Sequence, residues 1–333
     1  MKVLVVGGTG YLGQFLVERL AEDGDGEGAG HEVAFTYHTA GSGVVDGLVG
    51  PRARAFRVDL GSGDGLEAVG DGFGEPDAVI NCAAVSQPRL CEEKPELARE
   101  VNVPSQLVRW LRRRFDGRPL LLHLSTDHIY GGGRAWSKES DVEDDGGDAR
   151  AGGAGTSCSG NEPVNEYGRL KKEAEAFIRG NYANHAIFRS SIIYGKPRNV
   201  ARTLFLQWMD SALGSGERVD FFCDEYRCPI YVMDIVNVMK LAVGGLRDGL
   251  IQKEGGQRVF NLGGPERLSR YDMAAALCRH RGHAPALAAA VERPAHIKAP
   301  LDASMDITRL RNTFTGFEPT PFSKALVAIF DDD

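Results

Sequence analysis

The chain lacks three features, each of which would define a class of protein. It has no basic excess: 39 Lys and Arg stand against 46 Asp and Glu, so the net charge is −7 and we expect no nucleic-acid partner. It has no apolar run long enough to span a bilayer, so we expect no membrane insertion. Its cysteines form no C-x-x-C pair and have no zinc-like spacing to histidine, so we expect reduced thiols and no metal site. They are Cys82, Cys91, Cys158, Cys223, Cys228 and Cys278.

The first residues show no targeting segment. Met1 and Lys2 lead directly into the apolar stretch VLVV and then into glycines, without the pattern of a signal peptide or a transit peptide. We therefore expect a cytoplasmic protein. With 333 residues, 42% of them hydrophobic and 26% charged, the chain has an ordinary globular composition and exceeds what one core usually serves. Two lobes are the expectation.

Short apolar stretches alternate with helical ones over the first part of the chain. The opening KVLVVGGTGYLG is typical of a buried strand, a glycine turn and the start of a helix, and further strand-like runs follow. The alternation predicts an α/β fold with a doubly wound parallel sheet (Rossmann) at 1–195, to which 225–262 partly return. Residues 196–333 predict a smaller mixed substrate lobe, with a helix between an N-cap at Ser269 and a C-terminal Gly282.

One segment, residues 140–162, is rich in glycine and acidic residues and poor in apolar ones. It cannot bury enough surface to fold alone, so we expect an exposed insertion. Two interpretations stay open: an acidic tether that docks a partner or regulates the protein, and a surface insertion without a function of its own.

Three glycines in GGTGYLG predict a dinucleotide site. Gly7 permits the tight turn, Gly10 lets the backbone approach a pyrophosphate, and Gly13 lets the helix pack closely on the strand. The helix N-terminus that follows favours phosphate. Further predicted cofactor contacts from the same turn are Thr9, Tyr11 and Leu12.

The stretch FTYHT, at the end of the second predicted strand, favours NADP over NAD. A carboxylate there would bind the ribose hydroxyls of NAD and repel a 2′-phosphate, but the stretch offers Thr36, His38 and Thr39 instead. We therefore expect NADP(H), with NAD as the alternative. After the third strand, Asp59 beside Leu60 is placed to hydrogen-bond the adenine amine or, alternatively, to cap the following turn.

Tyr167 and Lys171 stand four residues apart in NEYGRLKKEAE, a stretch with a helical pattern. Positions i and i+4 share one helix face, so we expect the phenol and the ammonium side by side. An ammonium about 4 Å away stabilises the phenolate by roughly 4 kcal/mol, about three pKa units, and brings a phenol of pKa about 10 near neutrality. Such a phenol can act as acid and base in the reduction of a ketone.

The motifs GGTGYLG, INCAA, STDHIYG and YGRLK occur in the order found in the extended short-chain dehydrogenase/reductases, which this chain resembles. The resemblance implies that Thr126 joins Tyr167 and Lys171 in a catalytic triad and that Tyr167 and Lys171 also contact the cofactor. It implies substrate contacts at Asp127 and His128, although a packed loop histidine is the alternative for His128. Further implied cofactor contacts are Cys82, Ala83 and Ala84.

Within that family the chain is most similar to the dTDP-4-dehydrorhamnose reductases and to the regulatory β subunit of methionine adenosyltransferase. At Ile192, a predicted substrate contact, the bacterial reductases typically have a tryptophan. Arg227 opens RCPIYVMD, which resembles a stretch that holds a nucleotide pyrophosphate; an ion pair with Asp234 is the alternative.

The resemblance implies an NAD(P)H-dependent reductase of a keto group on a nucleotide-activated deoxysugar or a related small carbonyl. One alternative is an NADP-binding regulatory subunit that docks on the catalytic subunit of methionine adenosyltransferase. Another is a non-catalytic component of a larger assembly. Sequence alone does not separate them, because residues that bind a cofactor look like residues that use it.

Overall fold

The computed structural model describes most of the chain: residues 1–22, 30–39, 42–142, 162–200, 203–245, 249 and 258–331. The predicted insertion at 140–162 lies almost entirely outside the described residues, so both interpretations of it stay predictions. No helix of the described ranges is long and apolar enough to cross a membrane.

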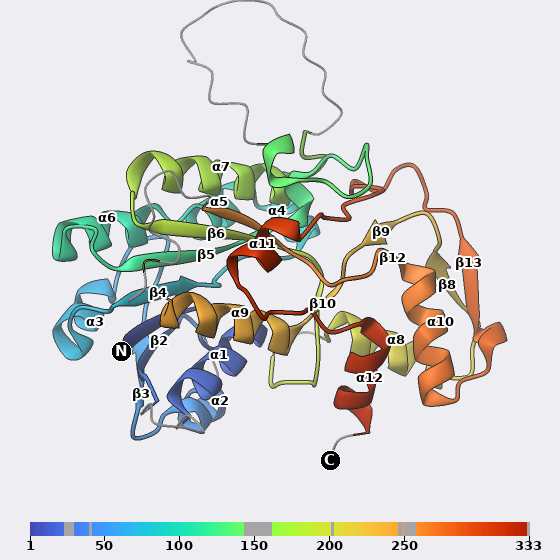
Figure 1. The fold of residues 1–333 in the computed structure, drawn as a ribbon, viewed down its shortest axis with the longest axis horizontal. Coiled ribbons are helices and arrows are strands. Elements are labelled where there is room, and N and C mark those ends of the chain that lie inside the picture. Colours follow the sequence, from blue (N-terminus) through green and yellow to red (C-terminus); the bar gives the residue numbers. More distant parts are fainter. Residues whose placement is uncertain are drawn as a thin grey trace, which may run out of the picture.

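Seven parallel strands form the central sheet of the described chain, in the order β11-β6-β5-β4-β1-β2-β3 (Figure 1). The strands are β1 (Lys2–Val6), β2 (Glu32–Tyr37), β3 (Ala53–Arg57), β4 (Ala78–Asn81), β5 (Leu120–Thr126), β6 (His185–Ser190) and β11 (Val259–Leu262). This confirms the predicted doubly wound parallel sheet. The strand order reverses between β1 and β4, and in such sheets ligands bind in the crevice beyond the carboxyl ends of the strands at that point.

The sheet is buried on both faces because its strands alternate between two apolar clusters. In β1, Val3 and Val5 belong to one cluster and Leu4 and Val6 to the other, and all four are fully buried. The helices α1 (Tyr11–Ala21), α2 (Ser42–Leu48), α9 (Val232–Gly244) and α11 (Thr308–Thr313) cover the first face. The second face is covered by α3 (Leu66–Phe73), α6 (Ser105–Phe115) and α7 (Glu166–Asn181) (Figure 1).

Two short helices extend the second face towards the carboxyl edge of the sheet. They are α4 (Pro88–Glu93) and α5 (Pro95–Asn102), and both pack against α7. Each begins with a proline in its first turn, where the missing N–H leaves no helical hydrogen bond unmade. The 3-10 helices η1 (Asp127–Ile129) and η2 (Glu139–Asp141) follow β5.

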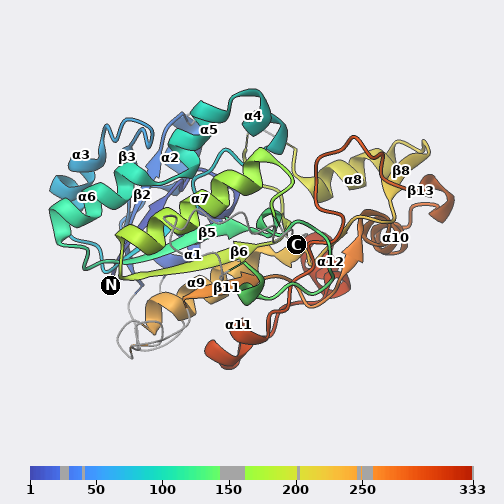
Figure 2. The same ribbon diagram turned by 90° about the horizontal axis from the view of Figure 1, so that it is seen from above.

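A smaller mixed lobe lies beyond the carboxyl ends of the strands, at the end of the molecule opposite α3 and α6 (Figure 2). It contains α8 (Phe205–Gly214), β8 (Val219–Phe222), β9 (Tyr226–Arg227), β12 (Leu268–Ser269), α10 (Arg270–Arg281), η4 (Pro285–Leu287), β13 (Ala288–Val291) and α12 (Phe322–Phe330). The parallel pair β7 (Ile193–Tyr194) and β10 (Ile230–Tyr231) joins it to the sheet. The lobe has its own apolar cluster, which includes Met209, Leu277 and Leu326.

The predicted caps of α10 are confirmed. The Ser269 hydroxyl accepts a hydrogen bond from the Asp272 backbone N–H at 3.0 Å, and Gly282 ends the helix at φ +74°. A domain boundary at residue 195 stays a prediction, because later residues contribute both to the lobe and, through β11, α9 and α11, to the sheet domain.

Candidate active site

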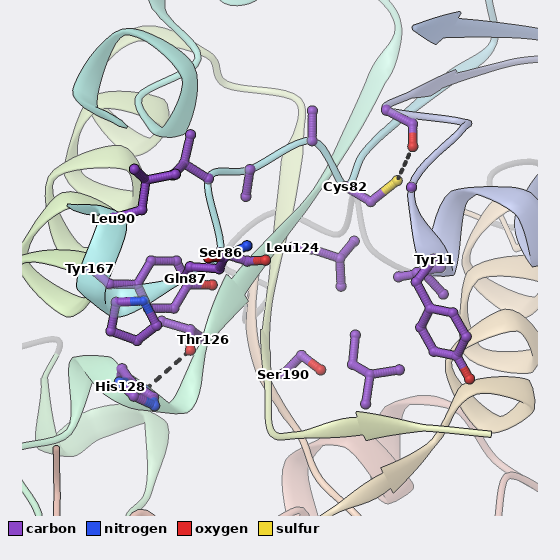
Figure 3. Close-up of a pocket in the computed structure, with 18 of the residues that line it drawn as sticks. Tyr11, Cys82, Ser86, Gln87, Leu90, Leu124, Thr126, His128, Tyr167 and Ser190 are labelled. Carbon is purple, nitrogen blue, oxygen red and sulfur yellow. Dashed lines mark hydrogen bonds between the residues drawn. The ribbon is translucent and has the colours of Figure 1, made fainter. Parts of the chain in front are cut away.

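A cleft of about 2320 Å³ lies between the carboxyl edge of the sheet and the lobe. All but one of the residues predicted for the site line it, and Figure 3 shows several of them facing the same space. The lining includes Gly7, Thr9, Gly10, Tyr11, Leu12, His38, Asp59, Leu60, Cys82, Ala83, Ala84, Thr126, Asp127, His128, Tyr167, Lys171, Ile192 and Arg227. The exception is Gly13, which lies behind the turn rather than in the cleft wall.

The glycine turn is closed by backbone contacts that tolerate no side chain. Gly7 has φ +84°, and a Cβ on it would lie 2.8 Å from the backbone N of Ala83. A Cβ on Gly13 would lie 2.2 Å from the carbonyl oxygen of Gly7. The Gly7 N–H donates to the Thr36 hydroxyl at 3.1 Å, so Thr36 fastens this turn to β2. The backbone of the turn therefore forms one wall of the cleft.

Asp59 and His38 lie at the far end of the same wall. The Asp59 carboxylate accepts from the Gly61 N–H at 2.8 Å, so its alternative role as a turn cap is present. Its other oxygen lies 3.8 Å from His38 Nε2.

Nearer the middle of the cleft, the Cys82 thiol donates to the Val6 carbonyl at 3.1 Å, and burial raises the pKa of this thiol to about 12. Cys82 is therefore an un-ionised packing residue at neutral pH.

Helix α7 brings Tyr167 and Lys171 to the cleft one turn apart. The helix begins at Glu166 because the Asn165 side chain caps it, accepting from the Gly168 N–H at 2.9 Å. Lys171 is 2% exposed, and its ammonium donates to the Leu124 carbonyl at 2.8 Å. The structure thus brings the predicted tyrosine and lysine to one cavity.

Burial lowers the pKa of Lys171 to about 8, although the Glu175 carboxylate, one turn further along α7, raises it. Glu175 is itself buried and ionised, since Arg189 donates to it at 2.7 Å and the Ser125 hydroxyl at 2.5 Å. Lys171 therefore carries its charge at neutral pH but loses it under mildly alkaline conditions.

Thr126 ends β5 beside Tyr167, but its hydroxyl proton has a partner within the protein. The hydroxyl donates to Asp127 Oδ1 at 3.2 Å. It also accepts from the His128 N–H at 3.2 Å, as Figure 3 shows. Asp127 is 2% exposed and also accepts from the Ser191 hydroxyl at 2.9 Å. The ring of His128 meets the ring of Tyr167 edge-on, with centroids 5.7 Å apart.

A cluster of buried charges forms the lobe side of the cleft. Arg227 is fully buried and lies 3.8 Å from Asp127 and 3.4 Å from Glu225. Glu225 also pairs with Arg270 at 3.1 Å and with Arg293 at 3.9 Å. Three guanidinium groups thus face two carboxylates. Two of the nitrogens of Arg227, Nε and one NH2 group, have no hydrogen-bond acceptor among the described residues.

The cluster corrects one sequence interpretation of Arg227. Its carboxylate partner is not Asp234, which instead accepts from the backbone and hydroxyl of Thr320 at 2.7 and 2.8 Å. Sequence reasoning missed Glu225 and Arg270, since neither belongs to a local motif. It also missed Trp208, which is 45% exposed and lines the cleft.

No group of three or more His, Cys, Asp or Glu side chains in the described part of the chain is arranged to hold a metal ion. The parts of the cleft lining that could hold a dinucleotide are the glycine turn, the N-terminus of α1 and the small residues that follow β4. A parallel sheet with this order, a glycine turn at its switch point and a Tyr-x-x-x-Lys helix beside it define the class of the extended short-chain dehydrogenase/reductases.

The chain belongs to the RmlD substrate binding domain family, whose model matches residues 1–333. Among its curated relatives, methionine adenosyltransferase 2 subunit beta from Danio rerio is 24% identical over 332 residues, which is 98% of this chain and 88% of that protein. A relative from Haloferax volcanii, named "Probable low-salt glycan biosynthesis reductase Agl14", is 30% identical over 233 residues, which is 69% of this chain and 66% of that protein.

Solved structures of low sequence identity share the fold. A dTDP-4-dehydrorhamnose reductase from Bacillus anthracis in complex with NADP has a TM-score of 0.69 at 17% identity and covers 100% of this chain and 99% of its own. A UDP-glucose 4-epimerase from Thermotoga maritima with UDP-glucose has a TM-score of 0.74 at 19% identity, and the match covers 98% of this chain and 96% of the epimerase. The predicted resemblance and fold class are therefore confirmed, and both agree with the predicted oxidoreductase class.

Proposed function

We propose that the protein is an NAD(P)H-dependent reductase of a keto group on a nucleotide-activated deoxysugar. The observation that carries the proposal is the meeting of Tyr167 and Lys171 with the glycine turn of Gly7 in one cleft. The reduced nicotinamide, when bound, supplies the hydride. The protein has to hold the ketone and deliver a proton to its oxygen as the alkoxide forms.

In this proposal Tyr167 donates that proton, and the buried ammonium of Lys171 makes the phenol acidic enough to do so. Glu175 maintains the lysine charge against burial, because it is the strongest influence that raises the pKa of Lys171. Thr126 is proposed as the third member of the triad and holds the loop that carries His128.

The proposal of a nucleotide sugar is supported by the charges at the lobe side of the cleft. Arg227 and Arg270 line it and share the buried carboxylates of Asp127 and Glu225 with Arg293, so that three guanidinium groups stand against two carboxylates. Guanidinium groups suit the oxygens of a pyrophosphate. Arg227 also opens the RCPIYVMD stretch that resembles the pyrophosphate-binding stretch of sugar-modifying relatives.

We propose NADP(H) as the cofactor in preference to NAD(H). The end of β2 offers Thr36, His38 and Thr39 and no carboxylate that would repel a 2′-phosphate. Fluorescence titration with NADPH and NADH tests the preference. A Thr39→Asp variant is expected to weaken NADPH binding at least tenfold and leave NADH binding nearly unchanged, and a wild-type protein that prefers NADH would overturn the assignment.

The activity is tested with purified protein, NADPH and a set of dTDP-4-keto-6-deoxy sugars that includes dTDP-4-keto-6-deoxyglucose. The expected result is a ketone-dependent loss of NADPH absorbance that Tyr167→Phe abolishes while cofactor binding persists. A protein that binds NADPH tightly but turns over no nucleotide-sugar ketone would contradict the proposal.

A second candidate is a regulatory subunit of methionine adenosyltransferase. It is favoured by the relative from Danio rerio, whose match spans 98% of this chain. Size-exclusion chromatography tests it, with this protein mixed with the catalytic methionine adenosyltransferase of the organism from which this protein comes. A stoichiometric complex that survives Tyr167→Phe would favour regulation; separate elution at micromolar concentrations would count against it.

A further inference from the structure

The side chain of Asn165 has an orientation that its cap contact determines. Its oxygen accepts from the Gly168 N–H at 2.9 Å, so the oxygen and the nitrogen of the amide are not interchangeable. The amide nitrogen therefore faces His128 Nδ1 at 2.9 Å and the Lys298 carbonyl at 3.0 Å. Asn165 is 1% exposed, so water does not compete for these contacts.

An amide nitrogen only donates, so His128 Nδ1 has to be the acceptor of this hydrogen bond. A neutral imidazole that accepts at Nδ1 carries its proton on Nε2. Burial lowers the pKa of His128, which keeps the ring neutral near pH 7. The charged groups that influence it are Asp127, Glu225, Arg227 and Arg270, and their signs oppose one another.

The position of the His128 ring allows its Nε2–H to donate to a ligand in the cleft. His128 lines the cleft and contacts the ring of Tyr167, and Figure 3 shows it directly below Tyr167 and beside Thr126. The Thr126 hydroxyl donates to Asp127 at 3.2 Å and reaches a substrate only by turning away from that carboxylate, so a donor on His128 would act beside it. A ketone held between these residues meets a donor in Tyr167 and needs a second one to hold its oxygen.

We propose that Asn165 holds His128 as the Nε2–H tautomer and that His128 donates a hydrogen bond to the substrate oxygen that Tyr167 protonates. The substrate contact rests on the proposed reductase function, whereas the tautomer does not. His128 is then a substrate-positioning residue, and Asn165 acts through it.

The tautomer is tested by long-range ¹H–¹⁵N correlation NMR of the full-length protein, with the His128 signals assigned by their loss in His128→Gln. The expected wild-type spectrum shows a protonated Nε2 and an unprotonated Nδ1. Asn165→Asp keeps the acceptor for Gly168 N–H but replaces the donor to His128 by a carboxylate oxygen, so the proton should move to Nδ1. A protonated Nδ1 in the wild type would overturn the proposal.

Kinetics with NADPH and dTDP-4-keto-6-deoxyglucose test the substrate contact. Asn165→Asp and Asn165→Ser, which both retain the helix cap, should lower kcat/KM for the ketone about tenfold without changing the Kd of NADPH. His128→Leu should lose about as much, whereas His128→Gln, whose amide places a donor near the lost Nε2, should lose less. The matched control is Asn181→Asp, the same substitution at the last residue of α7.

Each outcome separates the two claims. If Asn165→Asp moves the proton to Nδ1 but leaves kcat/KM unchanged, His128 does not position the ketone. Equal losses in His128→Gln and His128→Leu would also contradict the contact. If the wild type has the Nε2–H tautomer but no turnover on this ketone, the proposed function fails together with the substrate contact, and the tautomer assignment stands.

Discussion

The two sides of the cleft are built by different means. The sheet side, around Gly7 and Gly13, consists of backbone and small side chains, and its contacts arise between residues close in sequence or on adjacent strands. The lobe side carries long charged side chains that come from β9 and the residue before it, α10 and the segment after β13, together with aromatic ones such as Trp208. Tyr167 and Lys171 stand between the two.

This difference separates general from particular recognition. A wall of backbone and glycine accepts any ligand with the right phosphate geometry, so it suits a cofactor shared by many enzymes. A wall of buried charges recognises one arrangement of groups, because an unmatched buried charge is costly. The cofactor is therefore expected to depend on the sheet side alone and the substrate on the lobe side.

Loss of the Tyr167 hydroxyl should have the greatest effect, and the effect should fall on the chemical step and not on cofactor binding. Tyr167→Phe is expected to lower kcat by about 10² to 10⁴, the usual contribution of a positioned acid, with an unchanged Kd for NADPH. Stopped-flow measurement of NADPH oxidation gives the rate. The control is Tyr182→Phe, which removes a phenol hydroxyl bonded to the Pro119 carbonyl at the other end of α7 and should retain full activity.

Arg270→Met should weaken binding of the nucleotide sugar at the lobe side and leave binding of NADPH at the sheet side unchanged. Losing this guanidinium, which is paired with Glu225 and proposed to contact the pyrophosphate, is expected to raise KM for the nucleotide sugar about 10- to 100-fold, because a charge-assisted contact contributes about 1.5–3 kcal/mol. Isothermal titration with NADPH should show no change. Arg267→Met, which breaks an ion pair with Asp302 in the same lobe away from the cleft, is the control, and an equal rise in KM there would contradict the assignment.

Gly13→Ala should affect the sheet side. Since its Cβ would lie 2.2 Å from the Gly7 carbonyl oxygen, the turn has to shift, and we expect a loss of about 1–3 kcal/mol in stability together with weaker NADPH binding. Urea unfolding and fluorescence titration measure the two effects. Gly47→Ala in α2 is the control: it meets no atom within 4 Å and should be neutral or stabilising.

The smallest effect concerns the buried ammonium of Lys171. Its pKa is about 8 in the folded protein and near 10.4 when unfolded, so between these values the unfolded chain binds more protons and stability rises with pH. The rise should be about 1 kcal/mol between pH 8 and 9. Urea unfolding at both pH values should show a smaller rise in the free energy of unfolding for Lys171→Met than for the wild type. An equal rise in the variant would mean that another group causes it.

The same contrast explains how much of the molecule could be predicted from sequence. The first strand, the glycine turn and the Tyr167–Lys171 helix depend on local patterns, and the structure has each of them where the sequence predicts it. Glu225 and Arg270 could not be identified as a pair, because they stand 45 residues apart and meet only when β9 and β12 pair. Asn165 could have been found as an N-cap, but its contact with His128 depends on the loop after β5.

The most direct test of the central claim follows the hydride rather than the absorbance. NADPH carrying deuterium at the transferred position of its nicotinamide is incubated with the protein and dTDP-4-keto-6-deoxyglucose, and the sugar product is examined by mass spectrometry. The account predicts one deuterium in the product with the wild type and, over the same incubation, at most about a hundredth as much labelled product with Tyr167→Phe. An unlabelled sugar with no reduced product, from protein shown to be saturated with NADPH, would contradict it.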